Sequence, residues 1–164
     1  IRGASEGQQP LDVLPDPRVE LDMTERIAKY QALQRAQELD VRMAVLRAAA
    51  AQMREGLERS LQLLASDDRD VATDLVGAAQ VLLANLEEVA DFTELDQYRS
   101  VVSGLSSSYD APTEGQRIDL IRMEEALRSL TDGLDGIRLL DLPRFRERLE
   151  AADVEVFPSL RPVG

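Results

Sequence analysis

The stretch RMAVLRAAAAQMREGLERSLQLL, residues 42–64, decides the fold class of this chain. Its apolar residues recur in steps of four and three, the spacing of the a and d positions of a heptad, and no proline interrupts them. The same spacing extends toward the N-terminus, and Asp22 or Thr24 is placed to cap the helix. The sequence therefore predicts one helix of about 44 residues, roughly 66 Å long. Its apolar seam consists of Ala32, Ala36, Leu39, Met43, Leu46, Ala50, Met53, Leu57 and Leu64, with Ser60 in one slot.

A second helical segment follows, with Ser66 or Asp67 as its expected N-cap. Its seam comprises Val71, Leu75, Ala78, Leu82, Leu86 and Val89, with Asn85 in one slot, and then Phe92, Leu95, Tyr98, Val102 and Leu105. The second set is displaced by one position, so either the helix bends near residues 91–93 or a new helix begins there with Thr93 as its cap. An unbroken helix of about 40 residues would lie antiparallel to the first along its whole length.

The loop SSSYDAPTEG, residues 106–115, separates this segment from a third. Thr113 and Gln116 have the spacing of a capping box that opens the next helix. Its stripe is Leu120, Met123, Leu127, Leu130, Leu134 and Ile137. Gly133 and Gly136 predict a fraying helix end. Asp141 and Pro143 then predict a new short helix that turns Phe145 and Leu149 inward.

These patterns predict an all-α fold: an elongated, antiparallel, coiled-coil-like bundle of three long helices plus a short C-terminal helix. Residues 1–17, with three prolines and two glycines, are expected to form an extended or disordered arm. Residues 18–152 would form the bundle, and residues 153–164 a C-terminal tail. No apolar run reaches the roughly 18–20 residues of a membrane span, so we expect no direct membrane insertion of this segment.

The composition excludes several kinds of chemistry. The chain has no Cys and no His, so it has no disulfide, no thiolate or imidazole metal ligand and no Ser-His-Asp or Cys-His catalytic group. It also lacks a Gly-rich phosphate loop and a nucleophile elbow. We therefore expect no enzyme, no cofactor and no metal. The formal charge of -12, from 31 acidic and 19 basic residues, argues against nucleic acid as a partner.

Three sets of residues are candidate sites. The first is the seam of the long helix, Leu39, Met43, Leu46, Ala50, Met53 and Leu57, as an interaction surface, although core packing alone would explain part of that set. The second is Arg138, Arg144 and Arg148, a local basic patch for an anion or an acidic partner segment; the alternative is pairing with Glu147, Glu150 and the acidic surface of the bundle. The third is Ser60 and Asn85, which either fix helix register, line a polar pocket or are exposed by a slight helix rotation.

The long helical surface favours a non-enzymatic protein–protein interaction module, an adaptor, scaffold or assembly subunit that contacts another protein or a second copy of itself. The alternative is a ligand-sensing helical bundle from a membrane receptor or sensor kinase. Its support is the polar seam positions, the long helices and a chain that begins with Ile1 rather than Met. On that basis we expect a soluble fragment, cytoplasmic or extracytoplasmic, of a larger protein.

Overall fold

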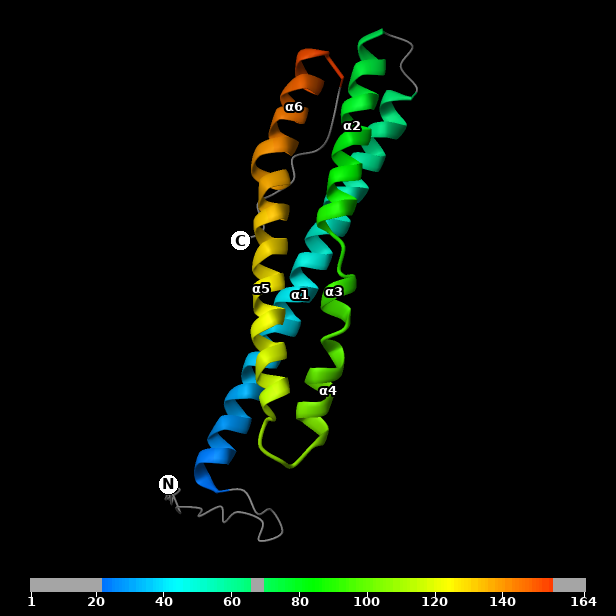
Figure 1. Cartoon of the computed structure of the whole chain (residues 1–164). Coiled ribbons are helices and arrows are strands. Elements are labelled where there is room, and N and C mark those ends of the chain that lie inside the picture. The colour runs from blue at the N-terminus through cyan, green and yellow to red at the C-terminus, as the bar shows by residue number, and fades with distance from the viewer. Residues whose placement is uncertain (1–21, 66–69, 155–164) are drawn as a thin grey trace, which may run out of the picture.

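The computed structural model describes residues 22–65 and 70–154, and every regular element within these residues is helical (Figure 1). The α-helices are α1 (Met23–Leu64), α2 (Asp70–Val89), α3 (Thr93–Asp96), α4 (Arg99–Ser107), α5 (Glu114–Gly136) and α6 (Leu142–Ala151), with a π-helix η1 (Ile137–Asp141) between the last two. The expected all-α class is confirmed. The proposed arm and most of the proposed tail lie outside the described residues.

Three rows of helix lie side by side (Figure 1). The long helix α1 runs in one direction, α2, α3 and α4 return along it, and α5 with η1 and α6 runs forward again. Helix α1 contacts α2, α4 and α5, so its inner face is covered along most of its length.

Capping boxes fix the starts of α1 and α5. The box at α5 is the predicted one, whereas at α1 the sequence predicted only that Asp22 or Thr24 caps the helix. The Asp22 carboxylate accepts a hydrogen bond from the Glu25 backbone N–H at 2.8 Å, and the Glu25 carboxylate accepts one from the Asp22 N–H at 3.0 Å. At α5 the Gln116 N–H donates to the Thr113 hydroxyl at 3.2 Å, and the Gln116 side chain accepts from the Thr113 N–H at 2.9 Å. Each box satisfies N–H groups that have no partner within the helix, and such a cap is worth about 1 kcal/mol. The expected caps Ser66 and Asp67 lie outside the described residues.

The second row is not one long helix. Helix α2 ends at Val89 and α3 begins at Thr93, so the alternative with a new helix is correct, and the count of three long helices is not confirmed. Thr93 does not cap α3: its backbone N–H donates to the Asp91 carboxylate at 2.9 Å, and Phe92 holds the cap position. The break resolves the one-position displacement of the seam, because it lets Leu95 turn into the core beside α1 and α5.

The buried stripe of the second row also differs from the expected one by one position at two sites. Ala79 is fully buried, while Ala78 is only half-buried. Val101 is buried, whereas Val102 lies at the edge of the core and is partly exposed. A seam counted from sequence alone does not fix the rotation of a short helix, since its neighbours decide which of two adjacent apolar residues is covered.

The predicted short C-terminal helix is present as α6, which begins at Leu142 and has Pro143 in its first turn. The helix before it does not fray at the glycines, contrary to the prediction. Helix α5 passes Gly133 and Gly136, enters η1 at Ile137 and continues directly into α6.

The π-helix explains why the pattern suggested a restart. A π-helical turn contains more residues than an α-helical turn, so it shifts the faces that follow it. Continued in steps of four and three, the stripe that ends at Ile137 would place Asp141, Arg144 and Arg148 inward. The shift instead turns Phe145 and Leu149 into the core, where they are buried as predicted.

Candidate interaction surfaces

The six seam residues proposed for interaction lie inside the bundle. Leu39, Met43, Ala50 and Leu57 are buried, and Leu46 and Met53 are half-buried against the same core clusters. Their neighbours belong to the same chain, which agrees with core packing as the reason for the seam. A partner would reach these side chains only if the bundle opened, so a surface for a partner on the intact bundle has to be sought elsewhere.

The opposite side of α1 carries a second stripe, which we call the outer stripe. It consists of Met23, Ile27, Tyr30, Gln34, Gln37, Val41, Val45, Ala48 and Gln52. All nine side chains are exposed, and none is charged. They also recur in steps of four and three, so they share one face of α1, opposite the buried seam. The same count along the sequence identifies them, but three of the nine are Gln, so their apolar pattern is weaker than that of the buried seam.

The larger apolar members of the outer stripe are strongly exposed. The exposed fractions are 68% for Met23, 50% for Ile27, 62% for Tyr30, 63% for Val41 and 62% for Val45. Single exposed apolar residues are ordinary, but an aligned series along one helix is typical of an interaction surface.

Three cations of α1 are held by other segments of the chain. Arg35 forms an ion pair with Glu124 of α5, and Arg47 forms one with Asp96 of α3. The Arg47 guanidinium also lies 5.0 Å from the centre of the Phe92 ring. Lys29 donates a hydrogen bond to the Asp110 carbonyl at 3.1 Å and another to the Ser108 carbonyl. These contacts keep three cations close to the bundle rather than over the stripe.

The ion pair of Arg35 and Glu124 changes the pKa of the Glu124 carboxyl. The hydrogen bond and the charge of Arg35 lower the pKa of Glu124 below its usual range, and the nearby charges of Arg128 and Arg42 act in the same direction. The pair lines a shallow hollow of about 300 Å³ between α1 and α5, next to Gln34 of the outer stripe.

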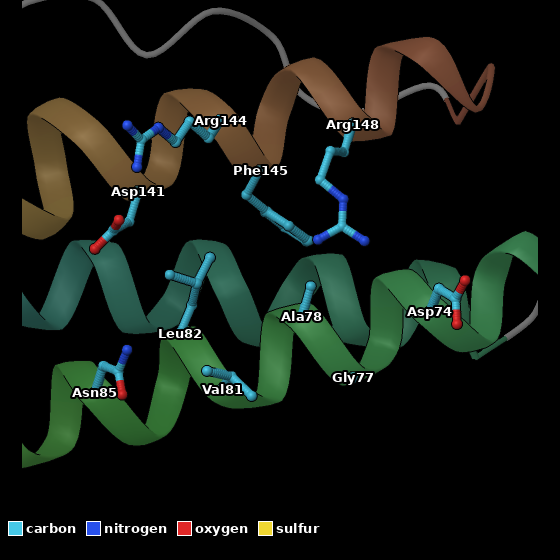
Figure 2. A pocket seen from close by; sticks show the side chains of 10 residues that line it. All are labelled: Asp74, Gly77, Ala78, Val81, Leu82, Asn85, Asp141, Arg144, Phe145 and Arg148. Atoms are coloured by element: carbon cyan, nitrogen blue, oxygen red, sulfur yellow. The ribbon is translucent and has the colours of Figure 1, made fainter.

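A larger groove of about 510 Å³ lies between α2 and the C-terminal helix (Figure 2). It is lined by Asp74, Gly77, Ala78, Val81, Leu82 and Asn85 from α2, and by Asp141, Arg144, Phe145 and Arg148 from η1 and α6. Apolar side chains lie in the middle of the groove, and charged side chains lie toward both ends (Figure 2).

The structure separates the two polar seam residues. Ser60 is buried, and its hydroxyl donates a hydrogen bond to the Gly56 carbonyl one turn earlier at 2.9 Å. Asn85 is exposed and lines the groove between α2 and α6. A shared polar pocket is therefore not formed.

The basic patch is only partly brought together. Arg144 and Arg148 both line the groove, whereas Arg138 pairs with Asp135 on its own helix at 2.9 Å. Among the described residues, no acidic side chain forms an ion pair with Arg144 or Arg148, so the expected pairing with Glu147 and Glu150 is not seen. Within the part of the chain that the structure describes, the groove thus holds two arginines without an ion-pair partner.

Within residues 22–65 and 70–154, no acidic side chains gather in a group suited to bind a metal ion. None of the helices in these ranges has the length and apolar character needed to cross a membrane. No known protein family, curated protein or solved structure matches the chain. Its surfaces are therefore the basis for a functional proposal.

Proposed function

We propose that this chain is a non-enzymatic protein–protein interaction module, an adaptor, scaffold or assembly subunit built as an elongated, coiled-coil-like bundle. The observation that supports it is the outer stripe of α1, which presents nine uncharged side chains in heptad spacing. On a chain with a formal charge of -12, so long an uncharged face is unusual. The remaining helices hold α1 in place and leave this face open.

The chemistry of the outer stripe suits docking of another helix. Burial of an uncharged surface requires no desolvation of charge, and apolar area gains about 25 cal/mol per Å². Tyr and Met are enriched in the centres of protein interfaces, and the stripe offers Tyr30 and Met23. Helix-in-groove recognition uses anchors spaced by three and four residues, which is the spacing of the stripe.

Site-specific photo-crosslinking tests this function. Tyr30 is replaced by benzoylphenylalanine in cells of the source organism, and the matched control carries the same replacement at Leu139 of η1, since Tyr30 and Leu139 are exposed by 62% and 60%. Helix η1 packs against α2, α5 and α6, away from the stripe. We expect a discrete adduct of higher mass from position 30 and none from position 139. The added change Val41→Glu should abolish that adduct. Absence of an adduct at position 30, or equal adducts at both positions, would contradict the proposal.

A second candidate function is a ligand-sensing domain of a membrane receptor or sensor kinase. The groove between α2 and α6 favours it, because Arg144 and Arg148 lie beside apolar side chains there without an ion pair among the described residues. A thermal-shift screen with small carboxylates and phosphates tests this function, since a ligand that binds the folded state raises its Tm. A shift lost in Arg148→Gln but kept in Arg122→Gln would support sensing, and a screen without any shift would argue against it.

A further inference from the structure

We propose that the outer stripe binds a second copy of this chain, with the two α1 helices antiparallel. This inference rests on the proposed function and names the partner. It starts from an asymmetry in side-chain size along the stripe. The N-terminal half presents Ile27 and Tyr30, and the C-terminal half presents the smaller Val45 and Ala48.

An antiparallel pair turns this asymmetry into complementarity. A twofold axis between Gln37 and Glu38 places Tyr30 of one copy against Val45 of the other, and Ile27 against Ala48. A large side chain then faces a smaller one at both levels, which keeps the distance between the helices even. In a parallel pair Tyr30 would face Tyr30 and Ala48 would face Ala48, so the helices would be forced apart at one level and leave a gap at the other.

The stripe is also long enough for a stable dimer. From residue 23 to residue 52 it spans about 44 Å at 1.5 Å per residue. A standard interface buries about 800 Å² on each partner, which requires about 90 Å² from each of the nine side chains. A Tyr side chain alone buries about 150–250 Å² when it is fully covered. The five large apolar members are 50–68% exposed, so most of their surface is available for burial.

Charge selects this face for self-association. Two copies with a formal charge of -12 each repel one another, and the outer stripe is a face of α1 whose nine members carry no charge. The carboxylate nearest to the contact is that of the exposed Glu38, which faces Gln37 of the other copy beside the twofold axis. Because the remaining repulsion is between exposed charges, added salt screens it. The dimer should therefore tighten between 50 mM and 500 mM salt, whereas a complex held by opposite charges would loosen.

The measurement is the mass of the purified chain by sedimentation and light scattering over a wide concentration range. We expect a monomer–dimer equilibrium that Val41→Glu shifts at least tenfold toward monomer. The matched control is Val81→Glu on α2, since Val41 and Val81 are exposed by 63% and 60%, and this change should leave the dimer intact. Equal effects of the two changes would overturn the assignment of the interface.

Cysteine cross-linking tests the orientation, because the chain has no cysteine of its own. The double variant Ile27→Cys with Ala48→Cys should oxidise to a covalent dimer. Ala48→Cys alone should not, because in an antiparallel pair the two thiols lie 21 residues apart along the helix axis, about 31 Å, far beyond disulfide reach. A covalent dimer of Ala48→Cys alone would indicate a parallel pair and overturn the inference.

The photo-crosslinking experiment separates failure of this inference from failure of the proposed function. An adduct from position 30 with twice the mass of the chain supports both. An adduct of another mass, together with a purified chain that remains monomeric, would overturn the inference that the partner is a second copy. The proposal of an interaction module would still hold. A monomeric chain without any adduct overturns both.

Discussion

Gly133 of α5 lies close to α2, and this contact can be tested by comparison with Gly136 of the same helix. A methyl group added at Gly133 would lie 2.7 Å from Cγ1 of Val89 and 3.5 Å from its Cγ2. A methyl group added at Gly136 would meet nothing within 4 Å. The two positions are three residues apart and both have helical neighbours, so Gly133→Ala and Gly136→Ala form a matched pair.

The expected free energies differ in sign. Ala is a better helix former than Gly by about 1 kcal/mol, so Gly136→Ala should raise the free energy of unfolding by about that amount. Gly133→Ala has the same gain, but its overlap with Val89 adds an overpacking cost of about 1–3 kcal/mol. The net result should be a loss of about 0–2 kcal/mol. The two variants should thus differ by about 1–3 kcal/mol.

Urea unfolding, followed by circular dichroism at one fixed protein concentration, measures this difference. A third variant identifies its cause, because Val89→Ala removes the methyl groups that the new side chain would meet. In the Val89→Ala background, Gly133→Ala should become stabilising, and the double-mutant cycle should give a coupling of about 1–3 kcal/mol. If Gly133→Ala stabilises the wild-type chain as much as Gly136→Ala does, the two helices do not approach as closely as described.

Three further predictions concern the C-terminal helix and the ion pair of α1. Deletion of Leu139, which is 60% exposed in η1, should convert the π-helix to α-helix and keep the core residues of α6 inward. Calorimetry should therefore find an unchanged or higher Tm. A marked fall in Tm would contradict the conclusion that η1 rotates the buried face of α6. Asp153 follows α6 with a φ of 53°, a backbone conformation in which a side chain costs about 1–2 kcal/mol. Asp153→Gly should therefore raise the free energy of unfolding, measured with urea, by up to about 1 kcal/mol. A lower free energy of unfolding would contradict this prediction. Arg35 lowers the folded-state pKa of Glu124 from 4.5, so the stability from this pair is present above pH 4.5 and is lost as the pH falls through the lowered pKa. The stability difference between wild type and Glu124→Gln should therefore vanish in acid, and a difference that persists at low pH would argue against the pairing.

The sequence predicted the features of the fold that depend on local chemistry. The capping box at Thr113, the cap at Asp22 and the buried stripes of α1 and α5 follow from spacing within a few helical turns. The outer stripe of α1 follows the same spacing, so it was also within reach of the sequence.

The break after Val89 and the π-helix after Gly136 were harder to predict, because a seam displaced by one position has several explanations. A bend in the helix, a break between two helices and an inserted residue can each bring the displaced apolar residues back onto the buried face. Packing between distant segments decides among them, as it does where Phe145 enters the core. The groove between α2 and α6 arises from that same packing of distant segments. No local sequence pattern therefore predicts that Asn85, Arg144 and Arg148 line the same groove.

The break after Val89 also divides the core of the bundle into two clusters. Residues of α2 and α6 belong to one cluster and residues of α3 and α4 to the other, while α1 and α5 run through both. Helices α3 and α4 have 4 and 9 residues, too few to persist without their neighbours. Amide protons of this segment should therefore exchange with solvent through local opening while α2 and α6 remain protected. The bundle is expected to loosen from one end, and the bulky half of the outer stripe lies on the α1 residues nearest that end.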